Sequence, residues 1–213
     1  MKYSAYIFDL DGTLLDTICD LTASCNYALR IHNMPERSVE EVRMMVGNGV
    51  KKLMERAVPG GQSNPDFESA YEDFRKHYLV HSLDTTQPYP GVLPVLSEMS
   101  RRGAKMAVVS NKFYAATQGL VEHFFGHLIH VAIGQRDDIR KKPAPDTIIE
   151  AMRQLGVSSG ESVYVGDSDV DILTARNSHM PCLSVTWGFR DRQFLIDHGA
   201  IILLDEPRQL LDY

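Results

Sequence analysis

Six short apolar runs, rich in valine and isoleucine, recur along the chain. Both faces of each run are apolar, as in strands buried within a parallel sheet. The runs occupy residues 3–9, 104–111, 130–135, 162–167, 182–188 and 200–206. Helical patterns lie between them, at 91–103, 113–126 and 144–156. This alternation of strands and helices predicts an α/β fold with a doubly wound parallel sheet.

One long segment, from about residue 16 to residue 84, interrupts the alternation. It contains no strand pattern, and its helical patterns at 20–34, 38–49, 50–58 and 65–83 are separated by proline and glycine turns. A single long crossover is the simpler interpretation, but the size of the segment favours a separate helical lid. We therefore predict a core of residues 1–15 and 86–213 and a helical cap of residues 16–85, with hinges near 14–17 and 83–89.

Composition restricts the classes of partner. The 213 residues are 44% hydrophobic and carry a formal net charge of -6, and no basic tract marks a nucleic-acid surface. Three cysteines without a C-x-x-C motif fit a reducing compartment better than a disulfide framework. No apolar stretch is long enough for a membrane span. A cytoplasmic protein with a small-molecule partner is expected, and its oligomeric state is not predicted.

Polar residues gather where the predicted strands end. In open α/β sheets this rim binds ligands. The residues are Asp9 and Asp11, Ser110 and Asn111, Lys142, and then Asp167, Asp169 and Asp171. Carboxylates without imidazoles suit a hard cation such as Mg²⁺, and the hydroxyl and the ammonium suit a phosphate group. The rim therefore predicts a site for a phosphorylated ligand and a divalent metal.

These side chains also allow other interpretations. Aspartate before glycine is often only a turn former. A calcium loop counted from Asp9 or from Asp167 lacks the glycine and the glutamate that an EF-hand needs. The pairs His77/His81 and His123/His127 have the spacing of helical zinc ligands but no third ligand, so surface or packing histidines are expected. The role of Lys112 is undecided: it could contact the phosphate or be a surface charge.

Four segments together resemble a known family. "DLDGTLLDT", "VVSNK", "KKPAPD" and "GDSDVD" are similar, in this order, to the four motifs of the haloacid dehalogenase-like (HAD) phosphohydrolases. The placement of the insert after the first motif resembles their α-helical cap. The resemblance implies a Rossmann-like core. Residues 45–57, 88–92 and 187–189 further resemble the phosphoglycolate phosphatases of this superfamily.

The resemblance implies a role for each motif residue. Asp9 would be the nucleophile and Asp11 the general acid and base. Mg²⁺ would be held by Asp9, by the backbone carbonyl of Asp11 and by Asp167. The phosphate would be bound by Ser110, Asn111 and Lys142. Asp171 would orient the Lys142 ammonium or a metal-bound water from the second shell.

The turn "GNG" in the insert is expected to help choose the substrate. The resemblance places this turn in the part of the cap that faces the active site. Asn48, Gly49, Lys51 and Lys52 are therefore candidates to meet a substrate carboxylate. For the two lysines, solvated helix charges are an equally good interpretation.

The expected function is that of a Mg²⁺-dependent phosphomonoester hydrolase. It would act through an aspartyl-phosphate intermediate, with 2-phosphoglycolate as the substrate. Asp11 favours phosphate-ester cleavage over dehalogenation, which needs no acid. A pyrophosphatase, a sugar-phosphate phosphatase and a phosphoglucomutase remain alternatives within the superfamily. A non-catalytic, phosphate-binding regulatory module is the alternative from a different class.

Overall fold

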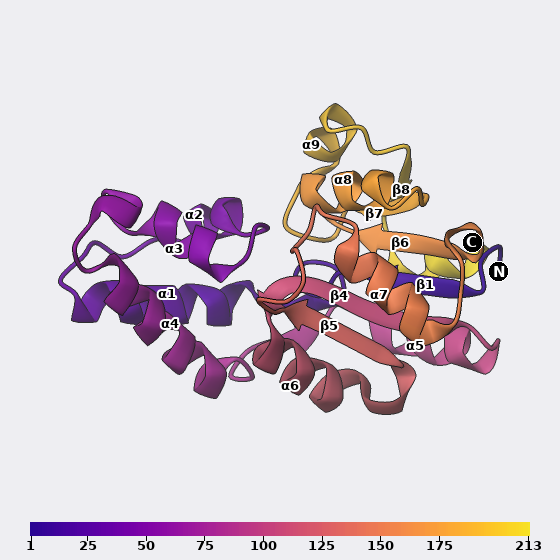
Figure 1. Cartoon of the computed structure of the whole chain (residues 1–213), viewed down its shortest axis with the longest axis horizontal. Coiled ribbons are helices and arrows are strands. Elements are labelled where there is room, and N and C mark those ends of the chain that lie inside the picture. The colour runs from indigo at the N-terminus through magenta and orange to yellow at the C-terminus, as the bar shows by residue number, and fades with distance from the viewer. The chain divides into compact units, whose positions relative to one another are not determined.

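The computed structural model describes all residues, 1–213. Figure 1 shows the order of the elements along the chain. The chain divides into two compact units, one formed by Met1–Asp16 with Pro88–Tyr213 and the other by Thr17–Gln87. The first unit holds the sheet, and the second is entirely helical apart from its end at strand β3. The active-site candidates of the four motifs all lie in the first unit.

A six-stranded sheet forms the centre of the first unit, and all its neighbouring strands are parallel. The order across the sheet is β5-β4-β1-β6-β7-β8. The strands are β1 Ala5–Phe8, β4 Lys105–Phe113, β5 Val131–Gln135, β6 Ser162–Gly166, β7 Cys182–Val185 and β8 Ile202–Leu204. The predicted α/β fold is thus confirmed, and the ends of β1, β4 and β6 are neighbours.

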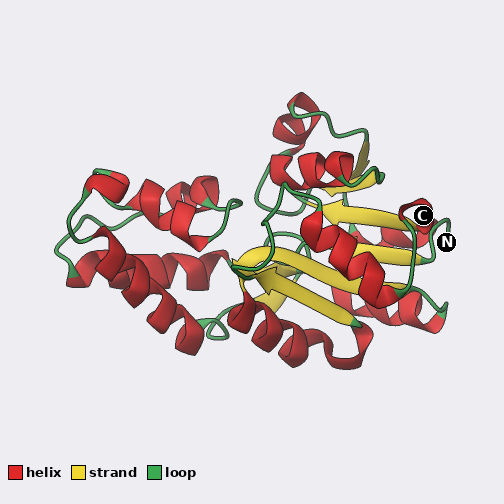
Figure 2. Cartoon of the chain, viewed as in Figure 1, coloured by secondary structure: helices red, strands yellow, loops and turns green.

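Two apolar clusters lie on opposite faces of this sheet. Because side chains alternate along a strand, Tyr6 and Phe8 belong to one cluster and Ile7 to the other. Helices α5 (Val92–Arg101) and α6 (Tyr114–Phe125) contribute to the first cluster. Helices α7 (Asp146–Leu155) and α8 (Asp169–Asn177) contribute to the second. Figure 2 shows helices flanking the strands, as a doubly wound sheet requires.

The boundaries of several elements differ from the predicted ones. Strand β4 continues to Phe113 instead of ending at Asn111, and its register shifts between Val109 and Phe113. Ser110 and Asn111 therefore lie within an irregular strand end. Helix α8 and the short α9 (Arg192–Asp197) were not predicted, because α8 starts with charged residues and both helices are short. Four 3₁₀ helices complete the chain, at Gly61–Ser63, Gly126–Leu128, Ser159–Glu161 and Pro207–Asp212.

The second unit consists of the helices predicted in the insert. They are α1 Ile18–Ile31, α2 Val39–Met45, α3 Val50–Ala57 and α4 Phe67–His81. Helix α2 starts at a capping box in which Ser38 and Glu41 satisfy each other's backbone N–H groups. No helix of the structure combines the length and the apolar character of a membrane span.

The carboxylate of Asp20 ties the first helix of the insert to the segment that leaves it. Asp20 is buried in α1 and accepts hydrogen bonds from the backbone N–H and hydroxyl groups of Thr85 and Thr86. Burial alone would raise the pKa of Asp20, but these donors together hold it below its usual value. The two ends of the insert are thereby held together. The short strands β2 (Leu15–Asp16) and β3 (Gln87–Pro88) pair beside them.

Candidate active site

The end of β1 forms a tight turn that exposes two carboxylates. Gly12 has a φ of 84°, in the left-handed region, and a Cβ there would lie 2.3 Å from Oδ2 of Asp167. The glycine thus permits both the turn and the close approach of Asp167. Asp9 precedes this turn, and its Oδ1 accepts a hydrogen bond from the N–H of Leu10 at 2.7 Å.

Asp167 follows β6 and is held by hydrogen bonds on both oxygens. The Thr13 hydroxyl donates to Oδ1 at 3.0 Å, and the Phe189 N–H donates to Oδ2 at 2.8 Å. Gly188 is as close as Gly12, since a Cβ there would meet Asp167 Cβ at 2.3 Å. Two glycines and two donors therefore fix the position of this carboxylate.

Lys142 lies between two of the aspartates. Its Nζ is 2.9 Å from Asp9 Oδ1 and 2.8 Å from Asp171 Oδ1, and the side chain is only 2% exposed. A buried cation with two anionic partners neutralises part of the charge of the cluster. Burial alone would lower the pKa of Lys142, but the carboxylates of Asp171 and Asp9 raise it above its usual value. The lysine therefore stays charged.

The Asp171 carboxylate is saturated with hydrogen bonds. Its Oδ1 accepts from Lys142 and from the Tyr164 hydroxyl. Its Oδ2 accepts from the N–H groups of Asp167 and Ser168 and from the Ser168 hydroxyl. A carboxylate offers about four lone-pair sites, so these donors leave little capacity for a direct metal bond.

Asp11 forms an ion pair with a lysine that the sequence left ambiguous. Lys112 Nζ lies 2.9 Å from both carboxylate oxygens of Asp11. The lysine side chain is 1% exposed and that of Asp11 13%. The interpretation of Lys112 as a surface charge is therefore wrong, because the irregular end of β4 turns it into the site.

The two remaining candidates for phosphate binding are also buried. Ser110 Oγ accepts a hydrogen bond from the Lys112 N–H at 3.2 Å. The side-chain amide of Asn111 donates to the Lys142 carbonyl at 3.1 Å. The end of β4 is thereby connected to the segment that carries Lys142.

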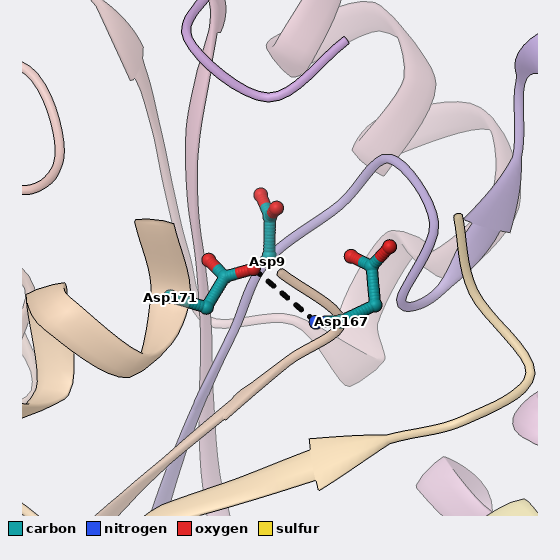
Figure 3. Close-up of side chains that lie close together, drawn as sticks. All are labelled: Asp9, Asp167 and Asp171. Carbon is teal, nitrogen blue, oxygen red and sulfur yellow. Dashed lines mark hydrogen bonds between the residues drawn. The ribbon is translucent and has the colours of Figure 1, made fainter. Parts of the chain in front are cut away.

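Three carboxylates crowd together beside Lys142. One oxygen from each of Asp9, Asp167 and Asp171 lies within 4.8 Å of the others, close enough for the three carboxylates to hold a metal ion together. Figure 3 shows these side chains, with the hydrogen bond from the Asp167 N–H to Asp171. Burial, followed by the neighbouring carboxylates of Asp171 and Asp9, raises the pKa of Asp167 well above its usual range.

The pKa of Asp9 is raised to about 7, mainly by burial. Lys142 opposes this rise, and the Asp171 and Asp11 carboxylates add to it. Burial thus disfavours the charged forms of Asp9 and Asp167, and a bound cation would offset this effect. A hard divalent ion fits this donor set, because carboxylate oxygens of Asp9 and Asp167 lie close together. An oxygen of Asp171 lies beside them.

Comparison with known proteins shows the family of this chain. The model of the haloacid dehalogenase-like hydrolases matches residues 6–185. The chain belongs to this family. The match confirms the family that the four sequence motifs predict.

Individual relatives of this haloacid dehalogenase-like hydrolase cover most of its length. Phosphoglycolate phosphatase 1 of Pseudomonas aeruginosa is 31% identical over 212 residues, which cover 96% of this chain and 77% of that protein. The N-acetylmuramic acid 6-phosphate phosphatase of the same organism is 27% identical over 214 residues, covering 100% and 95%. A Lactobacillus delbrueckii subsp. bulgaricus crystal structure, provisionally described as a phosphoglycolate phosphatase, is 38% identical. It has a TM-score of 0.94 and covers 99% of this chain and 97% of that one.

The candidates for substrate choice lie in the second unit. The Asn48 side chain accepts a hydrogen bond from Arg56, in the turn between α2 and α3. Lys51 pairs with Glu68 at 2.8 Å, and Lys52 pairs with Glu55 at 2.6 Å. Gly49 precedes α3 with a φ of 86°. Both lysines thus have partners within their own unit.

His77 and His81 pack within the second unit, whereas His123 and His127 are exposed. The rings of His77 and His81 stack at 4.2 Å, and His77 also stacks on Tyr27. His77 Nδ1 is hydrogen-bonded to Ser24. No third metal-ligating side chain joins either pair in a metal-binding group. Two contributors to the site were missed from the sequence, namely Tyr164 and the backbone N–H of Phe189.

Proposed function

We propose that this protein is a Mg²⁺-dependent phosphomonoester hydrolase that acts through a phosphoryl group carried by Asp9. The observation that carries the proposal is the pairing of two aspartates with two different buried lysines. Asp9 contacts Lys142, and Asp11 contacts Lys112. Two neighbouring carboxylates in distinct environments can serve as nucleophile and as proton carrier.

The first half of the reaction uses both aspartates. An Asp9 carboxylate oxygen attacks phosphorus, and the bond from phosphorus to the ester oxygen breaks. Asp11 takes up a proton from solvent when it leaves its pair with Lys112, and gives that proton to the leaving alkoxide. In the second half Asp11 takes a proton from water, whose oxygen attacks phosphorus and releases phosphate from Asp9. Before the substrate enters, Lys112 holds Asp11 in place.

Ser110, Asn111 and Lys142 are proposed to bind the phosphate oxygens. They lie at the same end of the sheet as Asp9, and Lys142 already contacts the proposed nucleophile. Oriented donors of this kind stabilise charge that grows in the transition state. Asp171 keeps the Lys142 ammonium directed toward Asp9.

Asp9 and Asp167, with the backbone carbonyl of Asp11, are proposed to hold the Mg²⁺. When bound, the ion offsets the repulsion between an anionic nucleophile and an anionic phosphate. The support for this assignment is the crowding of buried carboxylates and the raised pKa values of Asp9 and Asp167. Asp171 is proposed to orient Lys142 and not to bind the ion directly, because its oxygens are already hydrogen-bonded.

The substrate is proposed to be a phosphorylated acid, with 2-phosphoglycolate first. Its support is the phosphoglycolate phosphatase of P. aeruginosa, and the N-acetylmuramic acid 6-phosphate phosphatase makes a phosphorylated sugar acid the second candidate. We propose that the turn at Asn48 and Gly49 contacts the non-reacting carboxylate through its backbone N–H groups and the side-chain amide of Asn48. Lys51 and Lys52 are weaker candidates, because each already has an acidic partner. A cytoplasmic location is proposed from the three free cysteines.

Release of phosphate from a panel of esters tests the proposal. The panel contains 2-phosphoglycolate, N-acetylmuramic acid 6-phosphate, glucose 1-phosphate and pyrophosphate. We expect kcat/KM to be highest for 2-phosphoglycolate with Mg²⁺, and EDTA to abolish turnover. Conversion of glucose 1-phosphate into glucose 6-phosphate would identify a mutase. Binding of phosphate without turnover of any ester would identify a regulatory module.

A further inference from the structure

Tyr164 lies at the middle of β6, where the sequence indicates only a buried strand residue. Its ring is fully buried and packs with Ile7 and Ala151 in the cluster on one face of the sheet. Its hydroxyl reaches the proposed active site. The Oη atom lies 2.9 Å from Lys142 Nζ and 2.9 Å from Asp171 Oδ1.

The Tyr164 hydroxyl completes the hydrogen bonding of the lysine. An ammonium group has three N–H donors. Lys142 directs them to Asp9 at 2.9 Å, to Asp171 at 2.8 Å and to the Tyr164 oxygen at 2.9 Å. Because Lys142 is 2% exposed, bulk water cannot replace a missing partner. The three acceptors together fix where the ammonium lies.

The hydroxyl also has a defined direction. It accepts from Lys142 and donates to Asp171, so the proton of Tyr164 points away from the lysine. Burial, and then the carboxylates of Asp171 and Asp9, raise the pKa of Tyr164 well above its usual value. The hydroxyl therefore keeps its proton and remains a donor to Asp171.

We infer that Tyr164 is a positioning residue whose hydroxyl holds the Lys142 ammonium against the Asp9 carboxylate. The inference rests on the proposed function, in which Lys142 acts on the phosphoryl group. Without the hydroxyl, the third ammonium donor would be buried with no acceptor, and the lysine would move to find one. Misplacement of a charged group weakens its action on the transition state more than it weakens substrate binding.

Tyr164→Phe removes the hydroxyl and keeps the buried ring, so the fold is retained. The matched control is Tyr6→Phe, because Tyr6 is equally buried but packs in the cluster on the opposite face of the sheet. We expect Tyr164→Phe to lower kcat about tenfold or more while KM changes less than about threefold. The control should leave both parameters within about twofold. A kcat of Tyr164→Phe equal to that of Tyr6→Phe would overturn the inference.

A second readout does not depend on turnover. In protein labelled with ¹⁵N-lysine, the buried Lys142 ammonium should give a slowly exchanging NMR signal, assigned by its loss in Lys142→Arg. In Tyr164→Phe this signal should exchange faster with water or shift. The signal of Lys112, which is bound by Asp11, should stay unchanged. An unchanged Lys142 signal would overturn the inference even if no ester were hydrolysed, whereas failure of the wild-type protein on every ester would overturn only the proposed function.

Discussion

The two lysines of the site have different sequence signals. Lys142 lies in "KKPAPD" beside the exposed Lys141. Only the position within this motif indicates which of the two lysines belongs to the site. Lys112 follows Ser110 and Asn111, and neither burial nor a partner could be read from "VVSNK". Its place depends on the register shift near the end of β4, which arises from contacts with β5. Such non-local pairing has no signature in a short segment of sequence.

Lys112→Met tests the role of the second lysine. Removal of the ammonium leaves the Asp11 carboxylate without its buried partner, so Asp11 is free to adopt other positions. We expect kcat for the preferred ester to fall by about tenfold or more. Lys141→Met, at an exposed position, is the control and should keep kcat within about twofold. Equal kcat values for the two variants would show that the Lys112–Asp11 pair is not needed.

Residue types at strand ends were predicted from the sequence, but their hydrogen bonds were not. Asp9, Asp11 and Asp167 stand next to strand patterns and glycines, which make them visible. The local sequence identifies Tyr164 only as a strand residue. Its hydroxyl has two polar partners because the Lys142 segment and helix α8, which carries Asp171, both lie close to β6. The N–H of Phe189 has no side-chain signal at all.

At the scale of elements, the helices of the insert and the central strands were predicted well. Long runs with a clear period, such as those of α1 and α4, dictate their own structure. Helix α8 was missed, because its first turn lies in the motif that carries Asp169 and Asp171, which the sequence analysis interpreted only as site residues. A capping box at Ser168 starts this helix. The acidic residues of the site are therefore also the first turn of a helix.

Asp20→Asn should loosen the join between α1 and the segment Thr85–Thr86. The amide has one acceptor oxygen where the carboxylate has two, and its NH₂ group faces N–H and hydroxyl donors. We expect the free energy of unfolding in urea to fall by ~1–3 kcal/mol near neutral pH. Asp66→Asn, at an exposed position before α4, should change it little.

The pH dependence of this effect has a definite sign. Because the pKa of Asp20 is lowered in the folded protein, its contribution to stability is present above the ordinary aspartate pKa. It is lost as the pH falls through the lowered value. The difference between wild type and Asp20→Asn should therefore be largest near neutral pH and shrink in acid. A difference that did not depend on pH would contradict a role for the charge.

The turn between α2 and α3 is predicted to select the substrate. Asn48→Ala should lower kcat/KM for 2-phosphoglycolate by about tenfold, the effect of one lost charge-assisted hydrogen bond. Hydrolysis of p-nitrophenyl phosphate, which needs little recognition beyond the phosphate, should change much less. Equal losses on both esters would mean that the turn supports the fold. No loss on either would place substrate choice elsewhere in the insert.

For the whole molecule, the order of the motifs identified the family, and the sheet explains why that order matters. Segments far apart in sequence supply Asp9, Asp11, Lys142 and Asp167 to one rim because the strands that precede them, β1, β5 and β6, run parallel in one sheet. The strand order itself was not predicted. It depends on which strands pair across the intervening helices, and parallel strands carry no turn signal that would fix their neighbours.

The site as a whole should bind Mg²⁺ more tightly as the pH rises. The pKa of Asp9 is raised to about 7 and that of Asp167 is also raised, so protons compete with the metal at lower pH. Calorimetric titration from about pH 6 to about pH 8 should show rising affinity and release of protons on binding. Without metal, the folded state holds more protons than the unfolded state between the ordinary Asp value of 3.8 and about 7. Stability of the metal-free protein should therefore fall as the pH rises through that window.

The central claim is that Asp9 carries the phosphoryl group during turnover. The protein is mixed with Mg²⁺ and 2-phosphoglycolate and quenched in acid within the first turnover. The chain is then digested, and mass spectrometry gives the mass of the peptide that contains Asp9. The account predicts that this peptide gains the mass of one phosphoryl group in the wild type and not in Asp9→Asn. Turnover of the ester with no added mass at Asp9 in any early quench, or with full activity retained in Asp9→Asn, would contradict it.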